Sequence, residues 1–198
     1  MTRSMCWPQN PEVSHRFAIG SRIGVIVSNT PGAVDEATAT TAVFLLIATM
    51  RRFSECESHL RSGGFGPLRQ VEAGAQDLSG KTIGILGMGG IGSTFANLIR
   101  PFGMKMLYHN RRQSSVAPSD VGYVADLYDL LRDVDVLLVS IPLNDATRRF
   151  IGEKEIRSMK RGSIIINTAR GPIIDEEAMI GALQDGHVCH QPDVDETS

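Results

Sequence analysis

The sequence has few cysteines and no long apolar run, and each shortage excludes a class of protein. Its three cysteines, Cys6, Cys56 and Cys189, are far apart and form no C-x-x-C pair. Such a set argues against a disulfide framework and for a reducing compartment. The longest apolar run, residues 42–50, is far too short to span a bilayer, and the N-terminal MTRSMCWPQNPE lacks the apolar core of a signal peptide. We therefore predict a cytoplasmic protein with no membrane contact.

The chain also lacks an excess of charge of either sign. It has 20 Lys and Arg against 22 Asp and Glu, so the formal net charge is −2. The basic residues are scattered, apart from short pairs such as Arg111-Arg112. No nucleic-acid partner is predicted from this distribution. A length of 198 residues suffices for one domain and part of a second.

The most informative stretch that is present is KTIGILGMGGIG, residues 81–92. A strand is expected at 82–86, followed by G-x-G-x-x-G at Gly87, Gly89 and Gly92, and then a helix. The first glycine permits a tight turn, the second lets the backbone approach a pyrophosphate, and the third allows close packing of helix on strand. Apolar residues recur at helical spacing after the loop, at Ile91, Phe95, Leu98, Ile99 and Phe102. The pattern predicts a dinucleotide-binding loop.

Further strands and helices alternate beyond this loop, as in a parallel sheet that helices cover on both faces. We therefore predict an α/β fold with a Rossmann-type, doubly wound parallel sheet. The expected strands cover residues 104–108, a short stretch near 123, 134–141 and 163–167. The expected helices cover residues 91–102, 127–132, 153–159 and 175–184.

The first part of the chain has a different organisation. Residues 1–22 show no period and are expected to be irregular, whereas 23–27 (IGVIV) is rich in β-formers. A helical pattern runs from Val34 to about Phe53, with acids in its first turn and Arg51 and Arg52 in its last. Its expected face consists of Ala37, Thr41, Phe44, Leu45 and Ala48. Residues 54–80 contain several glycines and are expected to cross the surface as a connecting segment.

A second stretch with chemical potential is SIIINTARGPIID, residues 163–175. It places Arg170 just past the carboxyl end of a strand, where open α/β sheets bind ligands. An arginine there can bind a carboxylate through two parallel hydrogen bonds. A structural role is the alternative, in which Arg170 caps the strand end or pairs with Asp175 or Glu176 on the surface.

Several motifs in order resemble the D-isomer-specific 2-hydroxyacid dehydrogenase family, in particular its glyoxylate and hydroxypyruvate reductases. They are residues 24–31, the glycine loop, 139–143 with Thr147, and 167–171. The resemblance extends from about residue 23 to 186. It implies a remnant of a flavodoxin-like substrate domain at 23–53 and an NAD(P)-binding domain at 54–198. It also implies a homodimer formed through roughly Ser54 to Arg69.

The resemblance assigns roles to matching residues. Arg170 corresponds to the arginine that binds the carboxylate of a small 2-keto acid and polarises its carbonyl. Pro142 and Thr147 would lie beside the adenosine and phosphate half of the cofactor, Thr168 and Ala169 on the nicotinamide side, and Asp193 at the family's nicotinamide-side aspartate. The pyrophosphate-binding loop comprises Gly87, Met88, Gly89, Gly90, Ile91 and Gly92.

The family's glutamate and proton-donating histidine have no counterpart, since the register puts the glutamate at about Ser198 and the histidine beyond the end. We therefore expect reduction of 2-keto acids such as glyoxylate or hydroxypyruvate, with doubtful activity for these residues alone. The alternative is a non-catalytic NAD(P)-binding protein, either similar to a corepressor or a decayed paralogue. The spacing of His187, Cys189 and His190 fits no zinc pattern, so no metal is predicted.

The end of the second strand bears on cofactor choice. NAD enzymes place an acid there to bind the ribose 2′-OH, whereas NADP enzymes use neutral and basic groups. Asn110, Arg111 and Arg112 stand at this position, and Asp120 is too far along the chain to serve as the acid. The sequence therefore favours NADP over NAD. The alternative is that the two arginines form only a solvated basic turn.

Overall fold

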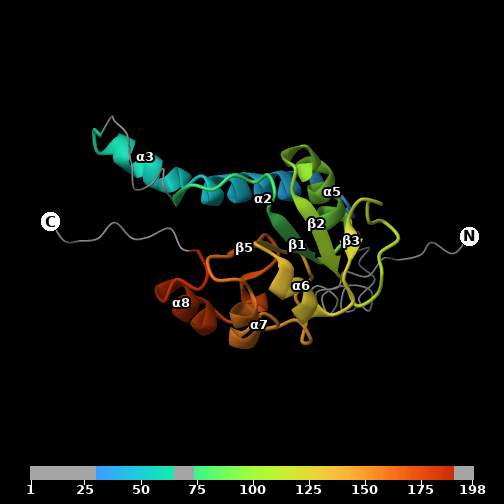
Figure 1. Ribbon diagram of the computed structural model, residues 1–198. Helices are drawn as coiled ribbons and strands as arrows, with labels where there is room; N and C mark the ends of the chain where they lie inside the picture. Colours follow the sequence, from blue (N-terminus) through green and yellow to red (C-terminus); the bar gives the residue numbers. More distant parts are fainter. Residues whose placement is uncertain (1–29, 65–73, 190–198) are drawn as a thin grey trace, which may run out of the picture.

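The computed structural model describes residues 30–64 and 74–189. Their five strands form a parallel sheet in the order β3-β2-β1-β4-β5 (Figure 1). The strands are β1 (Thr82–Leu86), β2 (Lys105–His109), β3 (Gly122–Tyr123), β4 (Val136–Val139) and β5 (Ile164–Asn167). Because the chain builds outward from β1 to β3 and then returns to place β4 on the other side of β1, the strand order reverses at β1. This arrangement confirms the predicted doubly wound sheet and puts its switch point beside the glycine loop.

Helices cover both faces of the sheet, as Figure 1 shows. One face carries α2 (Asp35–Met50) and α5 (Gly90–Ile99), and the other carries α6 (Leu127–Asp133), α7 (Glu153–Ser158) and α8 (Glu176–Gln184). Strand β4 supplies both cores, since Val136 and Leu138 join the first and Leu137 and Val139 the second. Burial on both faces explains why this strand is an uninterrupted apolar run.

The prediction of which face of α2 is buried is wrong. Residues Ala39, Ala42, Leu46 and Met50 are buried, whereas Phe44 from the predicted face is 58% exposed. The helix is apolar nearly all round, so its sequence period does not single out the side that packs on α5 and β5. Arg51 and Arg52, expected in the last turn, follow the helix.

Residues 54–80 are not only a connecting segment, which is a second correction. The helix stops at Met50, and Arg52 has a left-handed backbone with φ of 53° before α3 (Phe53–Arg61) begins. Arg52 and Glu55 form an ion pair there. No residue of α3 is buried, and in Figure 1 this helix projects away from the sheet beyond the end of α2.

The other predicted elements are present with shifted ends. β2 begins one residue later than expected, and β4 is shorter than residues 134–141. α5 ends at Ile99 and gives way to a 3-10 turn, Arg100–Phe102, where Pro101 stands. Leu98 and Phe102, expected on the buried face, are 39% and 37% exposed. The segments at 1–22 and 23–27 lie outside the described residues.

Candidate active site

Most of the predicted site residues collect at one edge of the sheet because the strand ends are in register. Leu86, the last residue of β1, is opposite both His109 of β2 and Val139 of β4. Val139 is opposite Asn167, the last residue of β5. The loops that follow these four strands therefore lie side by side. They contain the glycine loop, Asn110 to Arg112, Pro142 to Thr147, and Thr168 to Arg170.

The three glycines of the motif differ in what a side chain at each position would contact. Gly87 has a φ of +104°, and a Cβ there would lie 2.5 Å from the carbonyl oxygen of Ser140. A Cβ on Gly92 would overlap the carbonyl oxygen of Gly87 and stand 3.2 Å from Ile85 Cγ2. Gly89, in contrast, is exposed, and a Cβ there would meet no described atom within 4 Å. The first and third glycines serve the fold, while the second leaves room for a ligand.

Helix α5 begins directly behind this open position. Its N-cap residue is Gly89, so no side chain caps the helix, and its first turn, which includes Gly90 and Ile91, has no acidic residue. The N–H groups at the start of a helix lack intrahelical acceptors and carry a partial positive charge. The open glycine and this helix end fit the pyrophosphate of a dinucleotide.

The residue after β2 supports the glycine loop. Asn110 accepts a hydrogen bond from the backbone N–H of Met88 through Oδ1 at 2.8 Å. Ser114 donates its hydroxyl to the Met88 carbonyl at 2.8 Å, a contact that the sequence did not suggest. Arg111 and Arg112 are both exposed. The side chain of Asn110 therefore positions the loop, and the two arginines lie next to it at the end of β2.

Asp120 is paired with another side chain. Arg100 donates to it from Nε at 2.7 Å and from Nη2 at 2.9 Å. The hydrogen bond from Arg100 lowers the pKa of Asp120 below its ordinary value. This carboxylate is thus engaged by Arg100 just before β3 begins at Gly122.

The loop after β4 is shaped by one hydroxyl. Thr147 Oγ1 donates to the carbonyl of Pro142 at 2.7 Å and accepts from the N–H of Asn144 at 2.8 Å. The side chain of Asn144 also accepts from the N–H of Ala146 at 3.0 Å. Thr147 therefore fixes the turn that carries Pro142 at the same edge of the sheet.

Asn167 organises the turn that presents Arg170. Its Oδ1 accepts from the N–H of Ala169, and its Nδ2 donates to the carbonyl of Arg170, both at 3.0 Å. Arg170 is exposed and donates from Nη1 to the Ala169 carbonyl at 2.7 Å. Asp175, considered above as its partner, pairs with Arg149 at 3.6 Å instead. The guanidinium thus lies at the carboxyl end of β5 without a carboxylate among the described residues.

Thr168 stands in the same turn. Its hydroxyl is shielded from solvent and has no hydrogen-bond partner within residues 30–64 and 74–189. A buried hydroxyl that lacks such a partner is uncommon in folded proteins. The hydroxyl of Ser163, which precedes β5 at the opposite edge of the sheet, likewise has no partner among the described residues.

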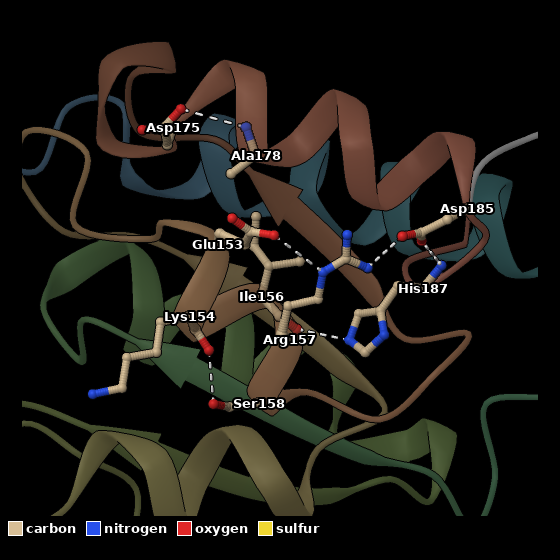
Figure 2. Close-up of polar contacts among 9 residues, drawn as sticks. All are labelled: Glu153, Lys154, Ile156, Arg157, Ser158, Asp175, Ala178, Asp185 and His187. Carbon is tan, nitrogen blue, oxygen red and sulfur yellow. Dashed lines mark hydrogen bonds and ion pairs between the residues drawn. The ribbon is translucent and has the colours of Figure 1, made fainter.

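A separate polar cluster joins α7 to the end of α8 (Figure 2). Arg157 bonds to Asp185 at 2.6 Å, and the ring of His187 is 2.9 Å from the carbonyl of Ile156 through Nε2. Burial alone would raise the pKa of Asp185, but hydrogen bonds from Arg157 and the His187 N–H lower it. The ring of His187 therefore contacts the backbone of α7. His190, which was considered with His187 as a zinc ligand, lies outside the described residues, and so does Asp193.

The comparisons with known proteins agree with this geometry. A family profile described as "D-isomer specific 2-hydroxyacid dehydrogenase, NAD binding domain" matches residues 43–195. This chain belongs to that family. The predicted resemblance is confirmed, and the sheet edge described above lies within the NAD-binding domain of a dehydrogenase family.

Named relatives include two reductases. The chain is 41% identical over 176 residues to a glyoxylate reductase of Aeropyrum pernix, covering 85% of this chain and 52% of that protein. It is 47% identical over 166 residues to 4-methyl-2-oxopentanoate reductase A of Aspergillus oryzae, covering 83% and 49%. The chain thus spans about half the length of the curated relatives it matches.

A solved structure also matches the fold. The crystal structure of a glyoxylate reductase from Paecilomyes thermophila superimposes with a TM-score of 0.77 and 39% sequence identity, over 92% of this chain and 54% of that one. As for membranes, none of the helices in the described part of the chain is both long and apolar enough to cross a bilayer.

Proposed function

We propose that this protein reduces a small 2-keto acid, such as glyoxylate or hydroxypyruvate, with a reduced nicotinamide cofactor. The names of the relatives support this substrate class, since they include glyoxylate reductases and a 4-methyl-2-oxopentanoate reductase. The domain assignment at 54–198 and a cytoplasmic location remain predictions. The substrate domain would be built in part from residues 23–53.

The position of Arg170 is the main support for this proposal. Its guanidinium is exposed at the same sheet edge as the glycine loop, and its hydrogen bond to Ala169 uses one of its nitrogens. The rest of the planar fork can bind a carboxylate through two hydrogen bonds. The bound nicotinamide would supply the hydride. Negative charge then develops on the C2 oxygen of the substrate, where a nearby cation stabilises the transition state more than the ground state.

The family establishes an NAD-binding domain, and we propose that NADP is the preferred form. Arg111 and Arg112 are exposed beside the glycine loop. The nearest acid considered from the sequence, Asp120, is held by Arg100. Two cations at this position suit a 2′-phosphate better than a ribose hydroxyl.

We propose a homodimer as the assembly. Helix α3 has no buried residue, and its Phe53 and Leu60 are 51% and 59% exposed. Phe44 of α2 adds a further exposed aromatic side chain. Large apolar groups on a projecting helix suit a self-complementary interface about a two-fold axis.

A non-catalytic NAD(P)-binding role is the second candidate, since cofactor binding needs only the glycine loop and the neighbouring strand ends, whereas reduction of a keto acid also needs a proton donor. His187 is engaged by Ile156, the His109 ring contacts the Val124 carbonyl at 3.0 Å, and His59 lies on α3. General acid catalysis typically contributes roughly 10²- to 10⁴-fold. We therefore expect the 198 residues alone to bind cofactor but to reduce keto acids barely above background.

The two candidates are separated by measuring NADPH binding and keto-acid reduction. The chain is tested alone and as a chimera that adds the remaining segments of the Aeropyrum pernix relative. We expect both to bind cofactor and the chimera to reduce glyoxylate. Arg170→Ala should abolish that turnover, whereas Arg132→Ala, which removes an exposed arginine on α6, should not. Cofactor binding by a chimera that lacks Arg170-dependent reduction would favour the non-catalytic role.

A further inference from the structure

Asp35 lies in the first turn of α2, yet its carboxylate reaches the glycine loop. A Cβ built on Gly90 would overlap Asp35 Oδ2 and would stand 2.9 Å from Cγ and 3.4 Å from Oδ1. Gly90 is exposed and is the first residue of α5, against which α2 packs. The carboxylate therefore covers the side of Gly90 that the absence of a side chain leaves open.

The surroundings of this carboxylate explain its position. The N-terminal end of α5 has no acidic residue in its own first turn and no side-chain cap. In residues 30–64 and 74–189, no hydrogen bond or ion pair engages the Asp35 side chain. An anion is favoured at such a helix end by the partial positive charge of the backbone N–H groups. Asp35 supplies that anion from a neighbouring helix.

We propose that Asp35 competes with the cofactor's pyrophosphate for the N-terminal end of α5 and so sets the affinity for dinucleotides. This inference rests on the proposed cofactor binding at the glycine loop. A pyrophosphate brings further negative charge to the position that the carboxylate faces. The side chain must rotate away when the cofactor enters, and it repels the phosphates afterwards. Removal of its charge should therefore tighten the binding of ligands that carry a pyrophosphate.

The test is a fluorescence titration of the full chain with NADH, together with calorimetric titrations with ADP and adenosine. Asp35→Asn is compared with Glu36→Gln, which removes an acid from the same helical turn at an exposed position. Both substitutions remove a negative charge that is favourable at the N-terminal end of α2, and Asp35→Asn also removes the charge that faces α5, so it should lower thermal stability further than Glu36→Gln does. We expect Asp35→Asn to lower the Kd for NADH and ADP by about five- to tenfold, as one unit charge a few ångströms from a phosphate implies.

Three control measurements test whether the effect comes from the charge of Asp35. Glu36→Gln should leave the Kd within about twofold, adenosine should bind Asp35→Asn and the wild type equally, and high salt should shrink the difference between them. If the wild type binds NADH and Asp35→Asn binds it equally well or more weakly, the inference about Asp35 is wrong, but the proposed cofactor role stands. NADH binding by none of the three proteins would overturn the proposed cofactor role and this inference with it.

Discussion

Asn110 holds the backbone of Met88 by accepting its N–H at 2.8 Å, which links the end of β2 to the glycine loop. The same carboxamide is 3.5 Å from the Met88 carbonyl through Nδ2. Because a buried N–H that loses its acceptor costs about 1–3 kcal/mol, Asn110→Ala should lower the free energy of unfolding by that amount. It should also weaken NADH binding, since the loop loses its support.

Denaturant unfolding and NADH titration of Asn110→Ala check this prediction. Asn110→Asp is the matched variant, because its carboxylate still accepts from the Met88 N–H. Asp at this position should retain most of the stability. If Asn110→Ala unfolds at the same denaturant concentration as the wild type, the link does not support the loop.

Substitutions of Gly87 and Gly89 should have different effects, the first on stability and the second on cofactor binding. Gly87→Ala should lower stability by about 2 kcal/mol or more, because the residue has a positive φ and its Cβ would meet the Ser140 carbonyl at 2.5 Å. Gly89→Ala should change stability by less than about 1 kcal/mol, since its Cβ would meet open space. Its methyl group should nevertheless weaken NADH binding at least tenfold, by keeping the pyrophosphate from the backbone. Equal NADH affinity in Gly89→Ala and the wild type would contradict this.

The fold could be predicted because local signals agree with tertiary structure. The apolar run of β4 and the glycine motif after β1 both reflect burial in a parallel sheet. The core face of α2 could not be predicted, since Phe44 and Leu46 are equally apolar and only packing against α5 decides which one is buried. α3 was not predicted because it is short, and only Phe53, Cys56 and Leu60 recur in it at helical spacing, none of them buried.

The candidate site was predictable where a motif follows a strand. Gly87 to Gly92 and Arg170 belong to such motifs, and the strand register brings them to one edge. Asp35 was not predictable, because its carboxylate reaches Gly90 only through the packing of two helices. The supporting contacts of Asn110 and Ser114 to Met88 likewise depend on how the loop after β2 folds back.

Cofactor choice can be tested at Arg111, an exposed residue at the end of β2. We expect the wild type to bind NADPH more tightly than NADH, and Arg111→Ala to remove most of the difference by losing a cation near the 2′-phosphate. Arg132→Ala serves as the control for a general change of charge. Tighter binding of NADH, unaffected by Arg111→Ala, would refute the proposed preference.

The proposed dimer can be tested at α3. Replacement of Phe53 and Leu60 by serine should convert a dimer into a monomer without loss of the helical core, because neither residue is buried in the protomer. Light scattering at tens of micromolar protein measures the mass. A monodisperse wild-type monomer at this concentration would show that the exposed residues of α3 do not form a stable interface.

Asp135 should couple stability to pH at the end of the sheet opposite the site. It precedes β4 and accepts from the Thr82 N–H at 2.8 Å and from Lys160 Nζ at 3.0 Å. Although partial burial alone would raise the pKa of Asp135, these two hydrogen bonds outweigh burial and lower it. A carboxyl whose pKa is lower in the folded state stabilises the protein above its unfolded pKa, which is about 3.9, and loses that contribution as the pH falls through the folded value.

Asp135→Asn should therefore flatten the decline in stability below about pH 5, because its amide oxygen still accepts from Thr82 but carries no charge. Asp135→Ala should in addition lower stability by about 1–2 kcal/mol at pH 7, since the Thr82 N–H loses its acceptor. Denaturant unfolding at pH 7 and at about pH 5, 4 and 3 measures both effects, since the contribution is lost below the unfolded pKa. Neither variant should alter NADH affinity, because Asp135 lies at the amino ends of the strands. A decline with falling pH in Asp135→Asn as steep as in the wild type would place the acid sensitivity in other carboxylates, such as Asp120 and Asp185, whose pKa values are also lowered.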